Sequence, residues 1–124
     1  MTRVGIISDT HGFLDEKIFS YFKDVDEVWH AGDFGTGVAE KIIAFKNLRG
    51  VYGNIDGKKV RQIFPLHNQF RIEELNVWIT HIGGFPPKYE PGMLQKLRTH
   101  TPDIFVCGHS HILKIFLKNN QNLD

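Results

Sequence analysis

Five predicted strands in this chain each lead into a polar turn that carries aspartate, asparagine or histidine. The first contains the apolar run Val4 to Ile7 and leads directly into the segment Ser8-Asp9-Thr10-His11-Gly12. A short unbroken apolar run is typical of a strand that is buried on both faces in a parallel sheet. Asp9 and His11 are two residues apart, so in an extended backbone their side chains point the same way and could reach one cation. An ordinary turn explains the same residue types, because Asp, Thr and Gly are common in turns.

The first half of the chain alternates strand-like and helix-like segments. This alternation predicts three strands, at residues 3–8, 27–31 and 48–52, and two helices, at residues 15–22 and 36–45. Strands that alternate with helices over such short distances favour a parallel sheet with right-handed crossovers.

The pattern changes after residue 57. We expect strands at residues 70–73, 77–80, 104–107 and 112–118, a turn at 74–76, a Gly/Pro-rich loop at 83–92 and a short helix at 93–100. The chain contains no internal repeat, low-complexity tract or linker, so residues 1–124 are expected to form one domain.

Charge and composition exclude several classes of function. The net charge is +1 at pH 7, which gives no electrostatic footprint for nucleic acid or an anionic membrane. No apolar run approaches the roughly 20 residues of a membrane span, and the first residues do not form a signal-peptide pattern. The one cysteine, Cys107, cannot form an internal disulfide, which favours a reducing, cytoplasmic location.

Seven metal-binding side chains directly follow predicted strands: Asp9, His11, Asp33, Asn54, His81, His109 and His111. Ligands of open α/β sheets bind at the carboxyl ends of strands, so we expect these side chains at one edge. Seven donors are too many for one ordinary site and suit two divalent ions. A mixture of imidazole, carboxylate and amide groups favours Mn, Ni, Zn, Fe or Co over Mg or Ca. A carboxylate can bind one metal with each oxygen, which makes Asp33 the natural bridge.

Five motifs in this order resemble those of the calcineurin-like metallophosphoesterase superfamily: Asp9-Thr10-His11, Gly32-Asp33, Gly53-Asn54, His81 and Gly108-His109-Ser110-His111. The resemblance runs from about residue 3 to residue 112. It is strongest to the small bacterial and archaeal phosphodiesterases and to their eukaryotic relative, the retromer scaffold subunit. The resemblance implies a four-layer α/β/β/α sandwich, a dinuclear metal centre, most often with manganese, and hydrolysis of a small phosphoester substrate.

The resemblance also implies how the ligands are shared. Asp33 bridges the two metals. The first metal takes Asp9, His11 and His111, and the second takes Asn54, His81 and His109. Hydroxide formed between two cations attacks phosphorus in line, so no side chain has to become a covalent nucleophile.

Two further residues are assigned supporting positions. His30 precedes Asp33 by three residues and is either a histidine that orients a metal ligand or a satisfied core histidine. Asp56 is expected to support the turn that carries Asn54, a structural role rather than a chemical one.

The chain departs from the family pattern at three places. After His81 many small members have a Gly-His pair, and this chain has Ile82-Gly83-Gly84. Many members have histidine after the Gly-Asn pair, where it is thought to assist the leaving group, and this chain has Ile55. Relatives also continue with several strands beyond the last motif, so the second sheet is expected to lack C-terminal strands and to have an open edge. Either the form is truncated or another chain covers the edge, for instance in a homo-oligomer. A non-catalytic metal-binding scaffold on the same fold is the alternative function.

Overall fold

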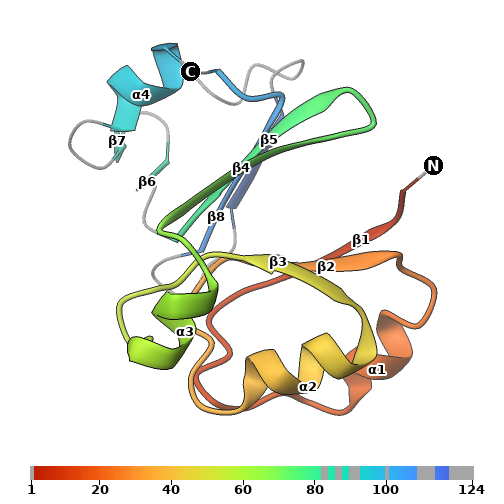
Figure 1. Cartoon of the computed structure of the whole chain (residues 1–124). Helices are drawn as coiled ribbons and strands as arrows, with labels where there is room; N and C mark the ends of the chain where they lie inside the picture. Colours follow the sequence, from red (N-terminus) through yellow and green to blue (C-terminus); the bar gives the residue numbers. More distant parts are fainter. Residues whose placement is uncertain are drawn as a thin grey trace.

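The computed structural model of the chain describes residues 2–81, 84–85, 88–89, 93–99, 101–108 and 114–117. The elements in chain order are β1 (Val4–Ile7), α1 (Lys17–Tyr21), β2 (Glu27–His30), α2 (Val38–Phe45), β3 (Asn47–Gly50), α3 (Lys58–Ile63), β4 (His67–Ile72), β5 (Leu75–Thr80), β6 (Gly84–Phe85), β7 (Lys88–Tyr89), α4 (Met93–Thr99), β8 (Ile104–Cys107) and β9 (Lys114–Leu117) (Figure 1). None of the helices in this part of the chain has the length and hydrophobicity that a membrane span requires.

The first sheet is parallel and has the strand order β1-β2-β3. All four residues of its central strand, β2, are buried, because both faces of the sheet are covered. Val28 faces the helices and packs with Val38 and Ile42 of α2, whereas its neighbour Trp29 faces the second sheet. The predicted β-α-β-α-β arrangement is therefore confirmed.

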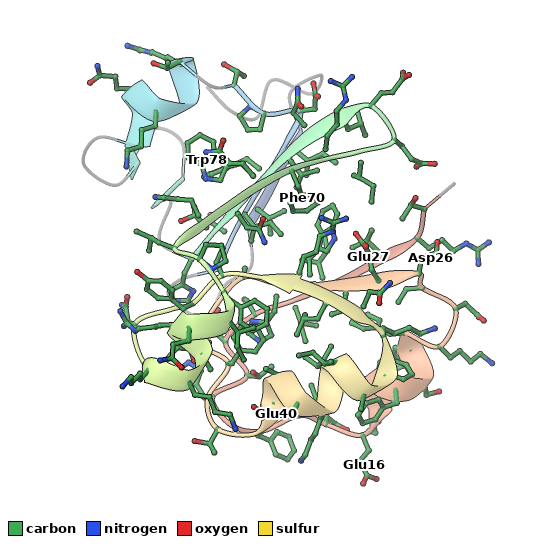
Figure 2. The ribbon with its side chains drawn as sticks, in the orientation of Figure 1. Glu16, Asp26, Glu27, Glu40, Phe70 and Trp78 are labelled. Carbon is green, nitrogen blue, oxygen red and sulfur yellow. The ribbon has the colours of Figure 1, made fainter. Side chains whose placement is uncertain are left out.

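The second sheet has the strand order β4-β5-β8-β9, in which only β5 and β8 are parallel. Its inner face meets the first sheet across a second apolar cluster, to which it contributes Val77, Ile79 and Val106. Figure 2 shows Phe70 in the space between the sheets and Trp78 on the opposite face of the second sheet. Helices α1 to α3 lie below the first sheet in Figure 1, and α4 lies beyond the second. The predicted four-layer α/β/β/α sandwich is confirmed.

Several predicted boundaries are wrong. The sequence pattern predicts no helix at α3, because none of its six residues is buried and its apolar signal is short, consisting of Val60, Ile63 and the C-cap residue Phe64. The turn between β4 and β5 is at Glu73 and Glu74, not at residues 74–76. Both glutamates have left-handed φ angles, 46° and 70°, a conformation that glycine and asparagine usually signal in a sequence. The strand predicted at 70–73 begins at His67, and the predicted loop at 83–92 contains β6 and β7.

The open edge expected for the second sheet would be at β9, the last strand in the sheet order, and the residues that follow it, 118–124, lie outside the described residues.

Candidate metal centre

The loops that follow β1 and β2 continue side by side beyond the end of the sheet. Three backbone hydrogen bonds join them: Asp9 N to Gly32 O at 2.9 Å, His11 N to Asp33 O at 3.0 Å, and Gly12 N to Phe34 O at 2.8 Å. These bonds extend the parallel pairing of the two strands into their loops. Two sequence-distant acidic residues, Asp9 and Asp33, are thereby held at one edge of the sheet.

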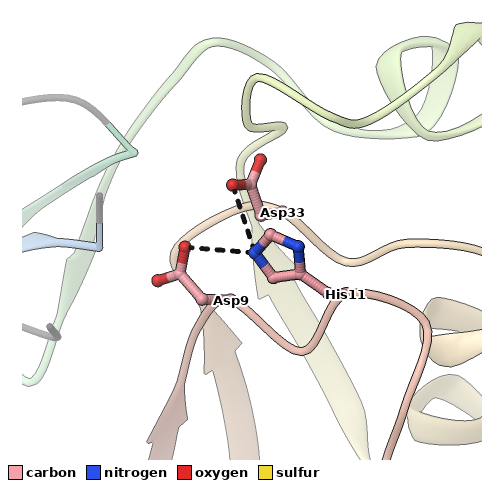
Figure 3. Close-up of side chains that lie close together, drawn as sticks. All are labelled: Asp9, His11 and Asp33. Carbon is pink, nitrogen blue, oxygen red and sulfur yellow. Dashed lines mark ion pairs between the residues drawn. The ribbon is translucent and has the colours of Figure 1, made fainter. Parts of the chain in front are cut away.

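Four side-chain atoms converge at this edge. The Nε2 atom of His11 lies 3.8 Å from Asp9 Oδ1 and 3.6 Å from Asp33 Oδ2 (Figure 3). The Nε2 atom of His81 approaches the same two oxygens from the second sheet, at 3.9 Å and 3.2 Å. Among the described residues, Asp9, His11 and Asp33 form a group whose ligand atoms all lie within 4.8 Å of one another, and His81 is not part of that group.

The spacing of these atoms fits ligands around a cation. With metal–ligand bonds of about 2.1 Å, neighbouring ligands are about 3.0 Å apart in octahedral geometry and about 3.4 Å apart in tetrahedral geometry. The four distances given above, 3.2–3.9 Å, are close to these values.

The hydrogen bonding of His81 agrees with a cation at this place. Its Nδ1 atom lies 2.7 Å from the carbonyl oxygen of Ala31, which can only accept, so Nδ1 carries the ring proton. In the neutral ring the lone pair of Nε2 is then directed toward the carboxylates of Asp9 and Asp33. Two carboxylates and an imidazole lone pair that face one another repel unless a positive charge lies between them, which either a proton on Nε2 or a bound metal ion supplies.

Three of the clustered residues have strained backbones. Asp9, His11 and Asp33 have φ angles of 55°, 50° and 61°, in the left-handed region that L-residues other than glycine seldom adopt. Each such conformation costs about 1–2 kcal/mol. Strain of this kind persists where the surrounding structure over-determines the backbone, and it concentrates at functional sites.

Glycine is required at two positions beside the cluster. A Cβ atom on Gly32 would lie 2.6 Å from Nδ1 of His81, and one on Gly53 would lie 2.1 Å from Oδ1 of Asp33. The backbone of each loop therefore approaches a clustered side chain so closely that no larger residue fits.

The loop that follows β3 also contacts Asp33. The amide of Ile55 donates a hydrogen bond to Asp33 Oδ1 at 3.0 Å, which leaves Oδ2 directed toward the two histidines. Asn54 lies in the same turn, next to Ile55, and is exposed.

His109 and His111 lie outside the described residues. Gly108, the residue before them, donates its amide to the carbonyl of His81 at 3.1 Å. Of the seven predicted ligands, the structure gathers four: Asp9, His11, Asp33 and His81.

His30 is fully buried and lies behind the cluster. Its Nδ1 accepts the amide of Gly32 at 3.1 Å, so its Nε2 carries the proton and donates to Thr10 Oγ1 at 3.0 Å. The Thr10 hydroxyl donates in turn to the carbonyl of Phe34 at 2.8 Å. Burial lowers the pKa of His30 to about 3, with a smaller contribution from His81 when that ring is protonated, so His30 is neutral near pH 7. His30 thus contacts Thr10, which lies between two clustered residues, rather than a clustered side chain.

Asp56 is also buried, and its carboxylate accepts hydrogen bonds from four backbone amides, those of Asp33, Phe34, Gly35 and Gly53. The bond to Gly53 supports the turn that carries Asn54, as the sequence analysis expected. The three bonds to the loop after β2 were not foreseen. They join residues 21 to 23 positions apart, and no local pattern in the sequence signals them.

The model of the calcineurin-like phosphoesterase superfamily domain matches residues 2–123. A probable metallophosphoesterase of Methanothermobacter thermautotrophicus is 29% identical over 115 residues, which cover 87% of this chain and 66% of that protein. The chain thus spans less than two thirds of this relative's length.

Two solved structures are similar throughout most of the fold. Vacuolar Protein Sorting 29 of Cryptosporidium parvum gives a TM-score of 0.71 at 25% identity and covers 95% of this chain and 69% of its own. An archaeal phosphodiesterase gives a TM-score of 0.69 at 25% identity, with 90% and 74% covered.

Proposed function

We propose that this chain, which belongs to the calcineurin-like phosphoesterase superfamily, is a metal-dependent hydrolase of small phosphoesters. The observation that carries the proposal is the convergence of Asp9 Oδ1, Asp33 Oδ2 and the Nε2 atoms of His11 and His81. The reaction class is phosphodiester or phosphomonoester hydrolysis at a dinuclear centre. Manganese is the proposed metal, and nickel, zinc, iron and cobalt suit the same donors.

The proposed ligand sets share Asp33. One metal takes Asp9, His11 and His111, and the other takes Asn54, His81 and His109. The surroundings of Asp33 support a bridge through one oxygen, because Oδ2 lies 3.6 Å from His11 Nε2 and 3.2 Å from His81 Nε2, which belong to different sets, while Oδ1 accepts the amide of Ile55.

When bound, the two cations supply a deprotonated water and neutralise charge on the phosphoryl oxygens. The protein's part is to hold the ligands rigidly, and the hydrogen bond from the Ile55 amide to Asp33 Oδ1 contributes to this. Ile55 is 50% exposed and cannot donate a proton to a leaving group. We therefore expect the chain to act best on esters with activated leaving groups. The proposed location is the cytoplasm.

The test is hydrolysis of bis-p-nitrophenyl phosphate by the full chain with added Mn²⁺. Turnover should disappear with a chelator and fall at least about 10³-fold in Asp33→Asn, because a metal ligand has become an amide. Asp26→Asn is the matched control, since Asp26 precedes β2 at the end opposite to Asp33 and accepts one amide, from Arg3, at 2.8 Å (Figure 2). Turnover that persists without metal, or in Asp33→Asn, would contradict the proposal.

A metal-binding scaffold is the second candidate function. The observation in its favour is that an exposed apolar side chain, Ile55, lies beside the cluster. The scaffold hypothesis expects Mn²⁺ binding without turnover of any phosphoester. It also expects an assembly, either with another protein or with a second copy of the chain through an open sheet edge. Sedimentation of the purified chain would reveal the second of these, the homo-oligomer.

A further inference from the structure

We propose that Asp56 is a positioning residue for the metal centre. Its carboxylate fixes the loop that carries Asp33 against the turn that carries Asn54, and it thereby sets the affinity for the divalent cation. The inference rests on the proposed metal-dependent function, because it concerns how the ligands of the cation are held.

The contacts of Asp56 join two loops that are separate in sequence. Its Oδ2 atom accepts the amides of Asp33 at 2.9 Å, Phe34 at 3.1 Å and Gly53 at 2.9 Å, and its Oδ1 atom accepts the amide of Gly35 at 3.0 Å. The side chain is buried, with 3% of the residue exposed. Hydrogen bonds to an ionised carboxylate are stronger than neutral ones, and burial strengthens them further.

Three consecutive amides converge on Asp56 because of the backbone conformation of the loop after β2. Asp33 has a φ angle of 61° and Gly35 one of 79°, and amides in such a sequence of conformations form an anion-binding concavity. Here the chain's own carboxylate fills that concavity. Without an acceptor, buried amides would lose their partners, and the strained backbone at Asp33 could relax.

The carboxylates of Asp33 and Asp56 each accept hydrogen bonds from the loop that carries the other. Asp56 accepts amides from the loop of Asp33, and Asp33 Oδ1 accepts the amide of Ile55 from the turn before Asp56. With Oδ1 held in this way, Oδ2 of Asp33 is directed toward His11 and His81. Asp56 therefore acts on the cation through Asp33. Arg61 of α3 anchors the turn, since its Nε donates to the carbonyl of Asp56 at 2.6 Å.

The change Asp56→Asn isolates this role because it keeps the shape of the side chain. One of the two acceptor oxygens becomes an NH₂ group, which faces an amide N–H instead of accepting from it. In either orientation of the carboxamide, at least one of the four bonds is lost and a donor meets a donor.

The experiment titrates Mn²⁺ into the full chain by isothermal calorimetry. Asp56→Asn should bind the ion about 10–100-fold more weakly than the wild-type chain, as is typical when a residue behind the ligands is changed. Ile42→Val is the control, since it removes a buried methyl group from the helix-side core and should lower the melting temperature without changing the affinity. If Asp56→Asn melts earlier but binds Mn²⁺ as tightly as the wild type, its role is structural only and the proposal is wrong.

Hydrogen exchange of the metal-free wild-type chain tests the same contacts without any variant. The amides of Phe34, Gly35 and Gly53 should be protected, and rapid exchange of all three would overturn the proposal even if Asp56→Asn failed to fold. Wild-type Mn²⁺ binding without phosphoester turnover, together with weak binding by Asp56→Asn, would support the positioning role and refute only the hydrolase. A wild-type chain that took up no Mn²⁺ would refute both.

Discussion

Gly53→Ala should weaken metal binding, because the new methyl group would displace both the carboxylate and the backbone nitrogen of Asp33. The backbone of Gly53 does not have a positive φ angle, so alanine meets no conformational penalty there. The obstacle is contact, because the new Cβ atom would lie 2.1 Å from Asp33 Oδ1 and 2.4 Å from the Asp33 amide nitrogen. Real Cβ atoms essentially never approach closer than 3.0 Å, so the carboxylate would have to retreat by about 0.9 Å.

A displacement of this size is large for a metal ligand. Metal–ligand distances hold to about ±0.2 Å, and a misplacement of about 1 Å at a reacting group typically costs on the order of 10²-fold. We therefore expect Mn²⁺ affinity and turnover of bis-p-nitrophenyl phosphate to fall by about 10²-fold or more. Calorimetric titration gives the first quantity and a colorimetric rate assay the second.

Gly57→Ala is the matched control, four residues further along the same loop. Gly57 has extended backbone angles, φ −88° and ψ −167°, and no heavy atom of the described chain other than its immediate neighbours lies within 4 Å of the new Cβ position. The control should bind Mn²⁺ as the wild type does. If Gly53→Ala also binds and hydrolyses normally, then Asp33 does not act as a ligand in the position described above.

Two further predictions concern stability. In the metal-free chain, burial holds the pKa of His30 near 3, below the 6.5 of the unfolded state. The stabilisation that the neutral His30 ring gives the folded state is therefore complete above pH 6.5 and is lost as the pH falls. Between pH 7 and pH 5, the unfolding free energy of the wild type, measured by urea denaturation, should fall by about 2 kcal/mol more than that of His30→Gln. If the unfolding free energies of the two proteins changed in parallel with pH, the prediction would be wrong. Glu74→Gly should raise the unfolding free energy by about 1 kcal/mol, because glycine adopts the 70° φ angle of this turn without strain, and a lower thermal midpoint would refute the explanation.

The elements that the sequence predicted correctly are those with a local signal. The buried strand β8, for example, is a short apolar run, and the predicted donors follow the strands directly. By contrast, α3 has no buried residue, and the β4–β5 turn is built from two glutamates in a conformation that their side chains do not announce. Local patterns report burial and turn chemistry, so elements that lack both are missed.

The candidate metal site also has some features that the sequence signals locally and others that depend on tertiary packing. The identity of the donors and their position after strands are properties of the sequence, because the carboxyl ends of parallel strands meet at one edge. Tertiary structure alone decided that His81 meets Asp33, that Asp56 binds the loop after β2, and that Asp9, His11 and Asp33 are held in left-handed conformations. The physical reason is range: a residue's type and its neighbours fix what it can donate, but hydrogen bonds across 21 to 50 residues depend on how the two sheets pack.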